Sequence, residues 1–83
     1  MRLYPNPVSS MGKLEVILDK PFTYQVDIFN QVGQKMLTVT PAESLPAGQV
    51  LTTINTSRLA SGIYHVVARI NGKMYTINMA VQH

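Results

Sequence analysis

Residues 63–81 read IYHVVARINGKMYTINMAV and carry the most regular pattern in the chain. Apolar residues recur at every second position from Ile63 to Ile70 and again from Lys73 to Val81. A period of two is typical of β-strands. Asn71-Gly72, between the two runs, favours a two-residue turn with positive φ at both positions. Because strands joined by so short a turn are antiparallel, the stretch predicts a β-hairpin.

Similar alternations fill most of the remaining sequence. Residues 30–33 have the length and the glycine of a bulged hairpin link, whereas Pro41 to Gly48 contains two prolines and is expected to form a loop. The expected strands are residues 2–4, 13–19, 23–30, 33–40, 50–55, 63–70 and 73–81. Seven short strands separated by turn residues predict an all-β sandwich of two small antiparallel sheets.

The expected core consists of the apolar residues on one face of each strand, together with Leu59 from a short connection. These residues are Leu14, Val16, Leu18, Val26, Ile28, Ile54, Leu59, Tyr64, Val66 and Ile77. A chain of this size buries only about 60–65% of its unfolded surface, so we expect it to fold alone with a modest margin.

Composition limits the chain to a few classes of protein. Its 83 residues suffice for one domain, and 46% hydrophobic with 13% charged residues argues against disorder. The absence of cysteine excludes disulfides and thiolate sites. No apolar stretch is long enough to cross a membrane as a helix, and the first residues lack the apolar region of a secretory signal peptide. If the chain is a fragment, any export signal lies upstream.

The titratable residues do not predict catalysis. His65 and His83 lie far apart in the sequence, and the four carboxylates, Glu15, Asp19, Asp27 and Glu43, are expected on strand exteriors or in loops. A Ser61–His65–Asp27 triad can be written, but no strained turn presents a serine as a nucleophile. The glycines are isolated and the basic residues are dispersed, which disfavours phosphate or nucleic-acid binding. We therefore expect no enzyme, no cofactor, no metal and no nucleic-acid partner.

Two features of the strands leave alternatives open. Ile17, Phe29 and Val67 fall on the outer faces, where they are either covered within the sandwich or form an exposed apolar patch for a partner. The last strand lies at a sheet edge, which is either merely structural or able to recruit another strand, including one from a second copy.

Several blocks of the sequence, in order, resemble the C-terminal sorting domain of type IX secretion cargo. The blocks are Tyr4-Pro5-Asn6-Pro7 followed by Leu-x-Val-x-Leu, then residues 26–35, 45–48 and 59–66, and the final strand from Tyr75 to Val81. Together they cover nearly all 83 residues. The chain departs from the family at its end, which reads Gln82-His83 where basic or short apolar residues often finish the domain.

The resemblance implies an immunoglobulin-like sandwich at the C-terminus of a larger exported protein, with residues 1–83 as a single sorting domain. It implies a non-catalytic signal that directs cargo through the outer-membrane translocon to the cell surface. The implied partners are an outer-membrane shuttle protein, a sortase-like peptidase that usually removes the domain, and anionic lipopolysaccharide to which the cargo is joined. Strand-mediated self-association stays open, and the alternative function is an immunoglobulin-like adhesion or carbohydrate-binding module with Tyr75 and Phe29 as its aromatic platform.

The resemblance places recognition near the terminal strands. The expected partner-recognition residues are Gly62, Ile63, Tyr64, Lys73, Tyr75, Ile77, Met79, Val81, Gln82 and His83, with Lys73, Gln82 and His83 as polar contacts. The expected turn-forming residues are Gly33, Asn71 and Gly72.

Overall fold

Alternating side chains produce seven strands and no helix in the computed structural model, which describes all residues 1–83. The strands are β1 Arg2–Tyr4, β2 Met11–Leu18, β3 Phe22–Phe29, β4 Lys35–Leu45, β5 Gly48–Asn55, β6 Gly62–Ile70 and β7 Lys73–Val81. All strand pairs within the sheets are antiparallel. No helix that could span a membrane is present.

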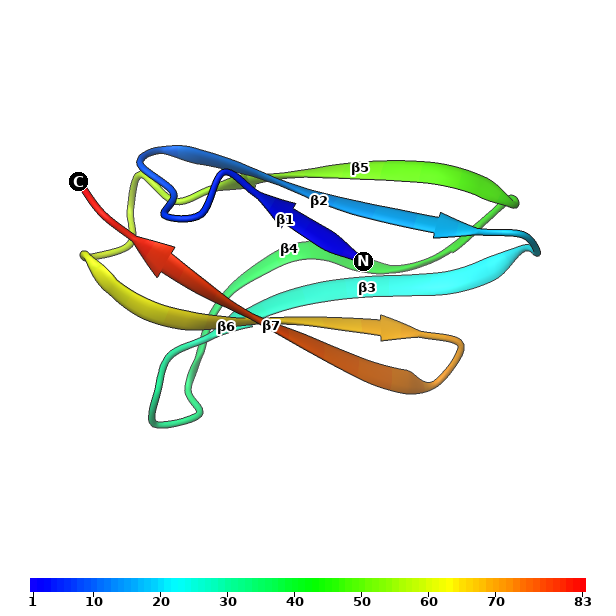
Figure 1. Cartoon of the computed structure of the whole chain (residues 1–83). Coiled ribbons are helices and arrows are strands. Elements are labelled where there is room, and N and C mark those ends of the chain that lie inside the picture. Colours follow the sequence, from blue (N-terminus) through cyan, green and yellow to red (C-terminus); the bar gives the residue numbers. More distant parts are fainter.

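Two sheets pack face to face (Figure 1). One has the order β1-β2-β5 and the other β4-β3-β6-β7. The short immunoglobulin-like sandwich expected from the sequence is confirmed. Strands β6 and β7 form the predicted hairpin, in register from Gly62 opposite Val81 to Ile70 opposite Lys73. Asn71 (φ 52°) and Gly72 (φ 80°) form its turn.

Strand β4 is longer than predicted, because residues 41–45 continue the strand instead of forming a loop. Pro41 has no N–H to donate, but β4 is an edge strand, where one side of the backbone needs no partner. The pairing of β3 with β4 also shifts register between Tyr24 and Val26, opposite Glu43 and Thr40, so that the residues around Pro41 bulge out of the ladder. The prediction of a loop here was wrong because proline disfavours central strands but not edge strands.

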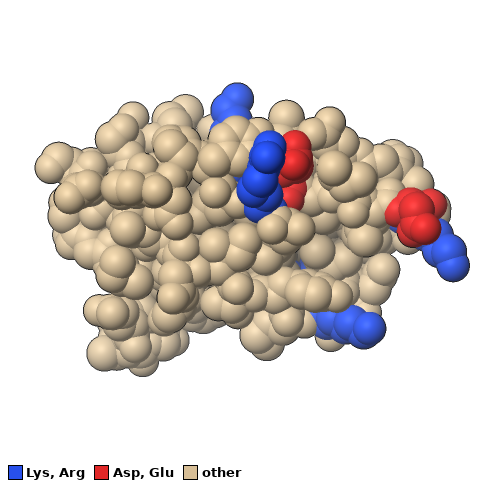
Figure 2. Space-filling model, viewed as in Figure 1, with Lys and Arg blue, Asp and Glu red and all other residues tan.

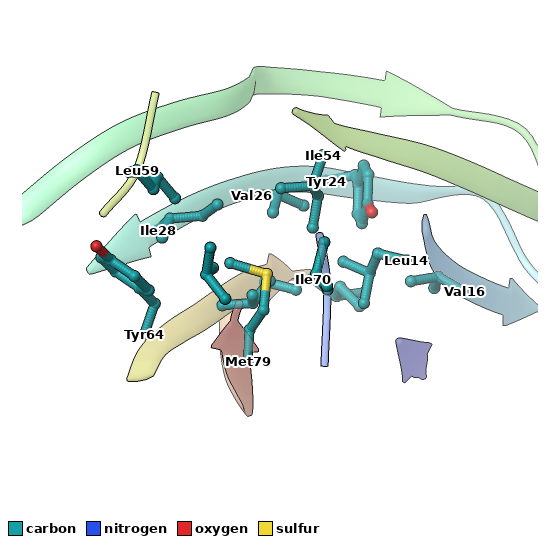
Figure 3. Packing of buried hydrophobic residues seen from close by; sticks show 14 of the residues in the cluster. Leu14, Val16, Tyr24, Val26, Ile28, Ile54, Leu59, Tyr64, Ile70 and Met79 are labelled. Atoms are coloured by element: carbon teal, nitrogen blue, oxygen red, sulfur yellow. The ribbon is translucent and has the colours of Figure 1, made fainter. Parts of the chain in front are cut away.

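The core lies between the sheets and contains most of the residues expected there (Figure 3). Leu59 is buried as predicted, whereas Leu18 and Ile77 are only half-buried. Further core residues that the expected list left out are Val8, Phe22, Tyr24, Ala68, Ile70, Met79 and Val81. Val8 is the informative member, because it belongs to no strand and is fully buried.

Candidate partner-recognition site

The β6–β7 hairpin is fastened to the strand beside it at its turn. The Asn71 N–H donates to the Thr23 carbonyl oxygen at 3.2 Å, and the Asn71 Oδ1 accepts from the Thr23 N–H at 3.1 Å. This pair of bonds links the turn to the start of β3. The hairpin is therefore a fixed part of the sandwich and not a free arm.

The side chains of β7 divide the expected recognition residues into two groups. Met79 and Val81 are buried in the core and Ile77 is half-buried, while Lys73 and Tyr75 are exposed. On the neighbouring strand and at the chain end, Gly62, Ile63, Gln82 and His83 are exposed. Tyr64 is buried and its hydroxyl donates to the Ala60 carbonyl oxygen at 2.7 Å. Only the exposed group can present side chains to a partner.

Half of the outer edge of β7 is covered by residues Asn6–Val8, which we call the clamp segment. The Val8 N–H donates to the Ala80 carbonyl at 2.7 Å, and the Gln82 N–H donates to the Val8 carbonyl at 2.9 Å. The Asn6 side chain donates to the Asn78 carbonyl and accepts from the Ala80 N–H, both at 3.1 Å. Val8 lies in a parallel bridge with Val81. The β7 edge, for which a structural role and the recruitment of another strand were both left open, is therefore unpaired only over its first half.

Peptide groups along β7 point alternately toward β6 and away from it, and this alternation identifies the groups that remain unpaired at the edge. The peptide groups of Ala80 point away from β6, and so do those of Met74 and Thr76, which lie an even number of residues away. No clamp residue reaches Met74 or Thr76. These two residues keep free peptide groups, and Met74 is 61% exposed.

The last residue is hydrogen-bonded to the domain, although Gln82 and His83 remain exposed to solvent. The His83 Nε2 lies 2.7 Å from the Leu59 carbonyl oxygen, so this ring nitrogen carries the proton and donates. The His83 backbone N–H donates to the Ser61 hydroxyl at 3.2 Å. Leu59 is a core residue, so His83 is held against the body of the domain.

The loop after β3 forms a small hollow with the start of β6. Asn30 organises this loop, because its Oδ1 accepts from the N–H groups of Val32 (3.1 Å) and Gln34 (2.9 Å). Gly33 has a φ of 86°, which glycine adopts without strain. The hollow, about 270 Å³, is lined by Asn30, Gln31, Val32, Gly62, Ile63 and Tyr64. The sequence placed Gly62–Tyr64 among the expected recognition residues and Val32 only in a turn; the hollow brings them together.

A second hollow, about 410 Å³, opens where the start of β4 faces the end of β5. It is lined by Met36, Leu37, Asn55, Ser57, Arg58 and Leu59. Arg58 is its one charged residue, and no acidic side chain lies within salt-bridge distance of it. The lining includes neither a carboxylate nor a histidine.

The burial of Ile17, Phe29 and Val67 was left open by the sequence, and two of them are covered on the outer face of the larger sheet. Val67 is buried and Phe29 half-buried, whereas Ile17, on the other sheet, is 66% exposed. These residues do not form one patch. Tyr75 pairs with the inward-facing Ala68 and Phe29 with the outward-facing His65, so the two aromatic rings lie on opposite faces and make no shared platform.

Asp27 lies on the same outer face but is buried, contrary to the expectation of an exposed carboxylate. Its Oδ2 accepts from the Gln25 side chain at 3.0 Å, and its Oδ1 lies 3.7 Å from the Lys35 Nζ without a hydrogen bond. The His65 Nδ1 pairs with the Asn78 Oδ1 at 2.9 Å. No hydrogen bond links His65 to Asp27 or Ser61, so the three residues are not arranged as a triad. No group of three His, Asp or Glu side chains is placed to hold a metal ion.

Comparison with protein families gives one match. The family model described as the secretion system C-terminal sorting domain matches residues 2–82, from the first residue of β1 to beyond the last residue of β7. No curated protein matches the chain.

Proposed function

Because the chain belongs to the family of type IX secretion C-terminal sorting domains, we propose that it directs a larger cargo protein to an outer-membrane shuttle and then to the cell surface. The family is non-catalytic, and its members mark proteins exported across the outer membrane. The observation that carries the proposal is the extent of the match, which includes all seven strands of the sandwich.

The later steps of the proposal concern the fate of the cargo. The parent protein crosses the periplasm, the shuttle delivers it, and a sortase-like peptidase removes the domain and joins the cargo to anionic lipopolysaccharide. Residues 1–83 act as one C-terminal domain in this process. The clamp segment docks against β7, so the part of the domain that follows the cargo in the chain and the last strand form one continuous surface. This arrangement supports the action of residues 1–83 as one domain.

Recognition is proposed to use the exposed members of the terminal strands: Gly62, Ile63, Lys73, Tyr75, Gln82 and His83. Tyr64, Ile77, Met79 and Val81 have a supporting role, because their side chains pack in or against the core. Asn71 and Gly72 set the hairpin turn, and Gly33 sets the loop after β3.

The proposal is tested by fusing the chain to a reporter with an export signal in a host that has a type IX system. Deleting residues 73–83 would be a poor test, since it removes Met79 and Val81 from the core. A better set is the intact domain, no domain, and Val66→Asp, which places a charge at a fully buried position. The fusion with the intact domain should reach the surface, where its mass should fall by that of the domain because the peptidase removes it. The other two fusions should stay in the periplasm.

Periplasmic retention of the intact fusion, with its domain shown to be folded, would contradict the sorting function. Surface arrival without loss of the domain would contradict the peptidase step alone. A sedimentation series of the isolated chain over a hundredfold concentration range separates self-association from recognition by the host machinery.

A further inference from the structure

The hollow between the β3–β4 loop and the start of β6 exposes two β-branched apolar side chains to solvent. Val32 is 80% exposed at the tip of the loop, and Ile63 is 42% exposed on β6. Both line the hollow of about 270 Å³. The hydrogen bonds of Asn30 hold the loop in place, so the hollow is a fixed feature of the surface.

Ile63 also has peptide groups without a partner. Ile63 lies opposite Ala80 in the β6–β7 ladder, and the N–H and carbonyl of Ala80 point outward to the clamp segment. Ile63 and Ala80 therefore exchange no hydrogen bonds. Because peptide groups alternate in direction along a ladder, those of Ile63 point away from β7, toward the β3 side. On that side β3 ends at Phe29, opposite His65, two residues short of Ile63. None of the backbone bonds made by turns and loops involves Ile63. One free donor and one free acceptor therefore face the hollow, in the position of an interrupted strand pair.

The six residues that line the hollow carry no formal charge. Residues 30–34, 59–68 and 74–83 contain no Lys, Arg, Asp or Glu. On the face that Figure 2 shows, the end of the molecule where the C-terminus and this loop lie, at the left of the view, has no blue or red atoms. Depletion of charged residues is typical of the centre of a protein interface.

We propose that this hollow binds an extended, uncharged peptide segment of the type IX outer-membrane machinery. The segment continues the interrupted pairing by exchanging hydrogen bonds with the N–H and carbonyl of Ile63, and it places an apolar side chain between Val32 and Ile63. Strand addition of this kind takes affinity from main-chain bonds and specificity from side-chain pockets. The inference rests on the proposed sorting function and names the surface and the partner chemistry for it.

The test uses the reporter fusion with two pairs of matched variants. Val32→Asp puts a charge into the hollow while keeping an Asp-Gly sequence that suits the turn, and Ile63→Thr removes apolar surface while keeping a β-branched residue. The controls are Met74→Asp, at the free half of the β7 edge, and Ile17→Thr, on the other sheet; both residues are more than 60% exposed. Each variant is first shown to unfold at the same denaturant midpoint as the parent chain within error.

We expect surface delivery to fall at least tenfold for Val32→Asp and several-fold for Ile63→Thr, with both controls within twofold of the parent. Normal delivery of Val32→Asp and Ile63→Thr, in a host where the parent domain delivers its reporter, would overturn the inference and leave the sorting function intact. A loss confined to Met74→Asp would assign the partner to the β7 edge instead. Failure of the parent domain itself would reject the sorting function and this inference with it.

Two measurements on the isolated chain complete the test. Amide hydrogen exchange should be fast at Ile63 and slow at Tyr64 and Val66, because only Ile63 lacks a backbone acceptor; a protected Ile63 amide would overturn the premise. Sedimentation should show the parent chain as a monomer. A dimer that Val32→Asp dissociates would identify a second copy as the occupant and overturn the assignment to the secretion machinery.

Discussion

Tyr24 shows how one residue joins the two sheets. Its ring is buried in β3, and its hydroxyl lies 2.7 Å from the Thr52 Oγ1 on β5 of the opposite sheet. Burial raises the pKa of the Tyr24 phenol above its usual value; the Thr52 hydrogen bond opposes this shift, and the negative charge of Glu43 adds to it. The neutral form is therefore favoured more strongly in the folded state than in the unfolded chain.

Tyr24→Phe tests this coupling. Loss of the hydrogen bond should lower the free energy of unfolding by about 1 kcal/mol at pH 7. The pKa of Tyr24 is higher in the folded state than in the unfolded chain. The stabilisation that neutral Tyr24 gives the folded state is therefore fully present below about pH 10, and it is lost as the pH rises through the pKa of the folded state. Above pH 10 the stability of the variant should therefore fall less steeply than that of the parent chain. Urea denaturation between pH 7 and 11 measures both effects.

Tyr75→Phe is the control for this prediction, since Tyr75 is 43% exposed and makes no hydrogen bond through its hydroxyl. Its free energy of unfolding at pH 7 should equal that of the parent chain. An equal alkaline slope for Tyr24→Phe and the parent would contradict the coupling.

At the scale of elements, the clamp segment decides what the last strand can do. A strand at a sheet edge offers its free peptide groups to other chains, and proteins commonly cover such edges. Here Asn6 and Val8 occupy the outward groups of Asn78, Ala80 and Gln82. The clamp segment thus blocks strand exchange over the second half of β7 and leaves Met74 and Thr76 free.

Asn6→Ala should loosen this cover. Losing two exposed hydrogen bonds should cost about 1 kcal/mol, and the Ala80 amide should exchange with solvent much faster because its acceptor is the Asn6 Oδ1. Gln49→Ala is the matched control, since it also removes an exposed side-chain bond, to Glu15 on the other sheet. Hydrogen exchange followed by NMR measures both variants. Unchanged protection of Ala80 in Asn6→Ala would show that the edge is covered by other means.

At the scale of the whole molecule, the sandwich has a small core and little stability to spare. Stabilities of about 0.05–0.15 kcal/mol per residue give about 4–12 kcal/mol for a chain of this length. The core holds fifteen residues in a single cluster. One substitution that leaves a large cavity in this core therefore removes a substantial part of the total free energy of unfolding.

Ile54→Ala should cost about 2–5 kcal/mol, because the Ile54 side chain is fully buried between the sheets. Leu51→Ala, three residues away on the same strand and 52% exposed, should cost far less. The denaturant midpoint at a constant m-value measures the difference. Equal losses in the two variants would mean that β5 does not pack as the structure has it.

The sequence by itself determined the strands, the β6–β7 hairpin, the sandwich and the family. These follow from local patterns: alternation with a period of two marks each strand, and Asn71-Gly72 fixes the turn because both residues accept positive φ. Gly62–Tyr64 was expected from the sequence to take part in recognition, and this stays a prediction. Local patterns do not describe which strands lie at an edge, so Pro41 was assigned to a loop although it lies in the edge strand β4.

Only the tertiary structure decided which groups on these strands are free. The Asn6–Ala80 hydrogen bond spans 74 residues, and nothing in the sequence around either residue indicates the other. Val8 and Asp27 are buried, and His83 is docked, through contacts made across the fold. The free peptide groups of Ile63 arise because β3 ends at Phe29, opposite His65, whereas β6 already begins at Gly62. Edge cover and interrupted pairing depend on how strands of unequal length meet in three dimensions, whereas hydrophobic alternation depends only on each strand's own residues.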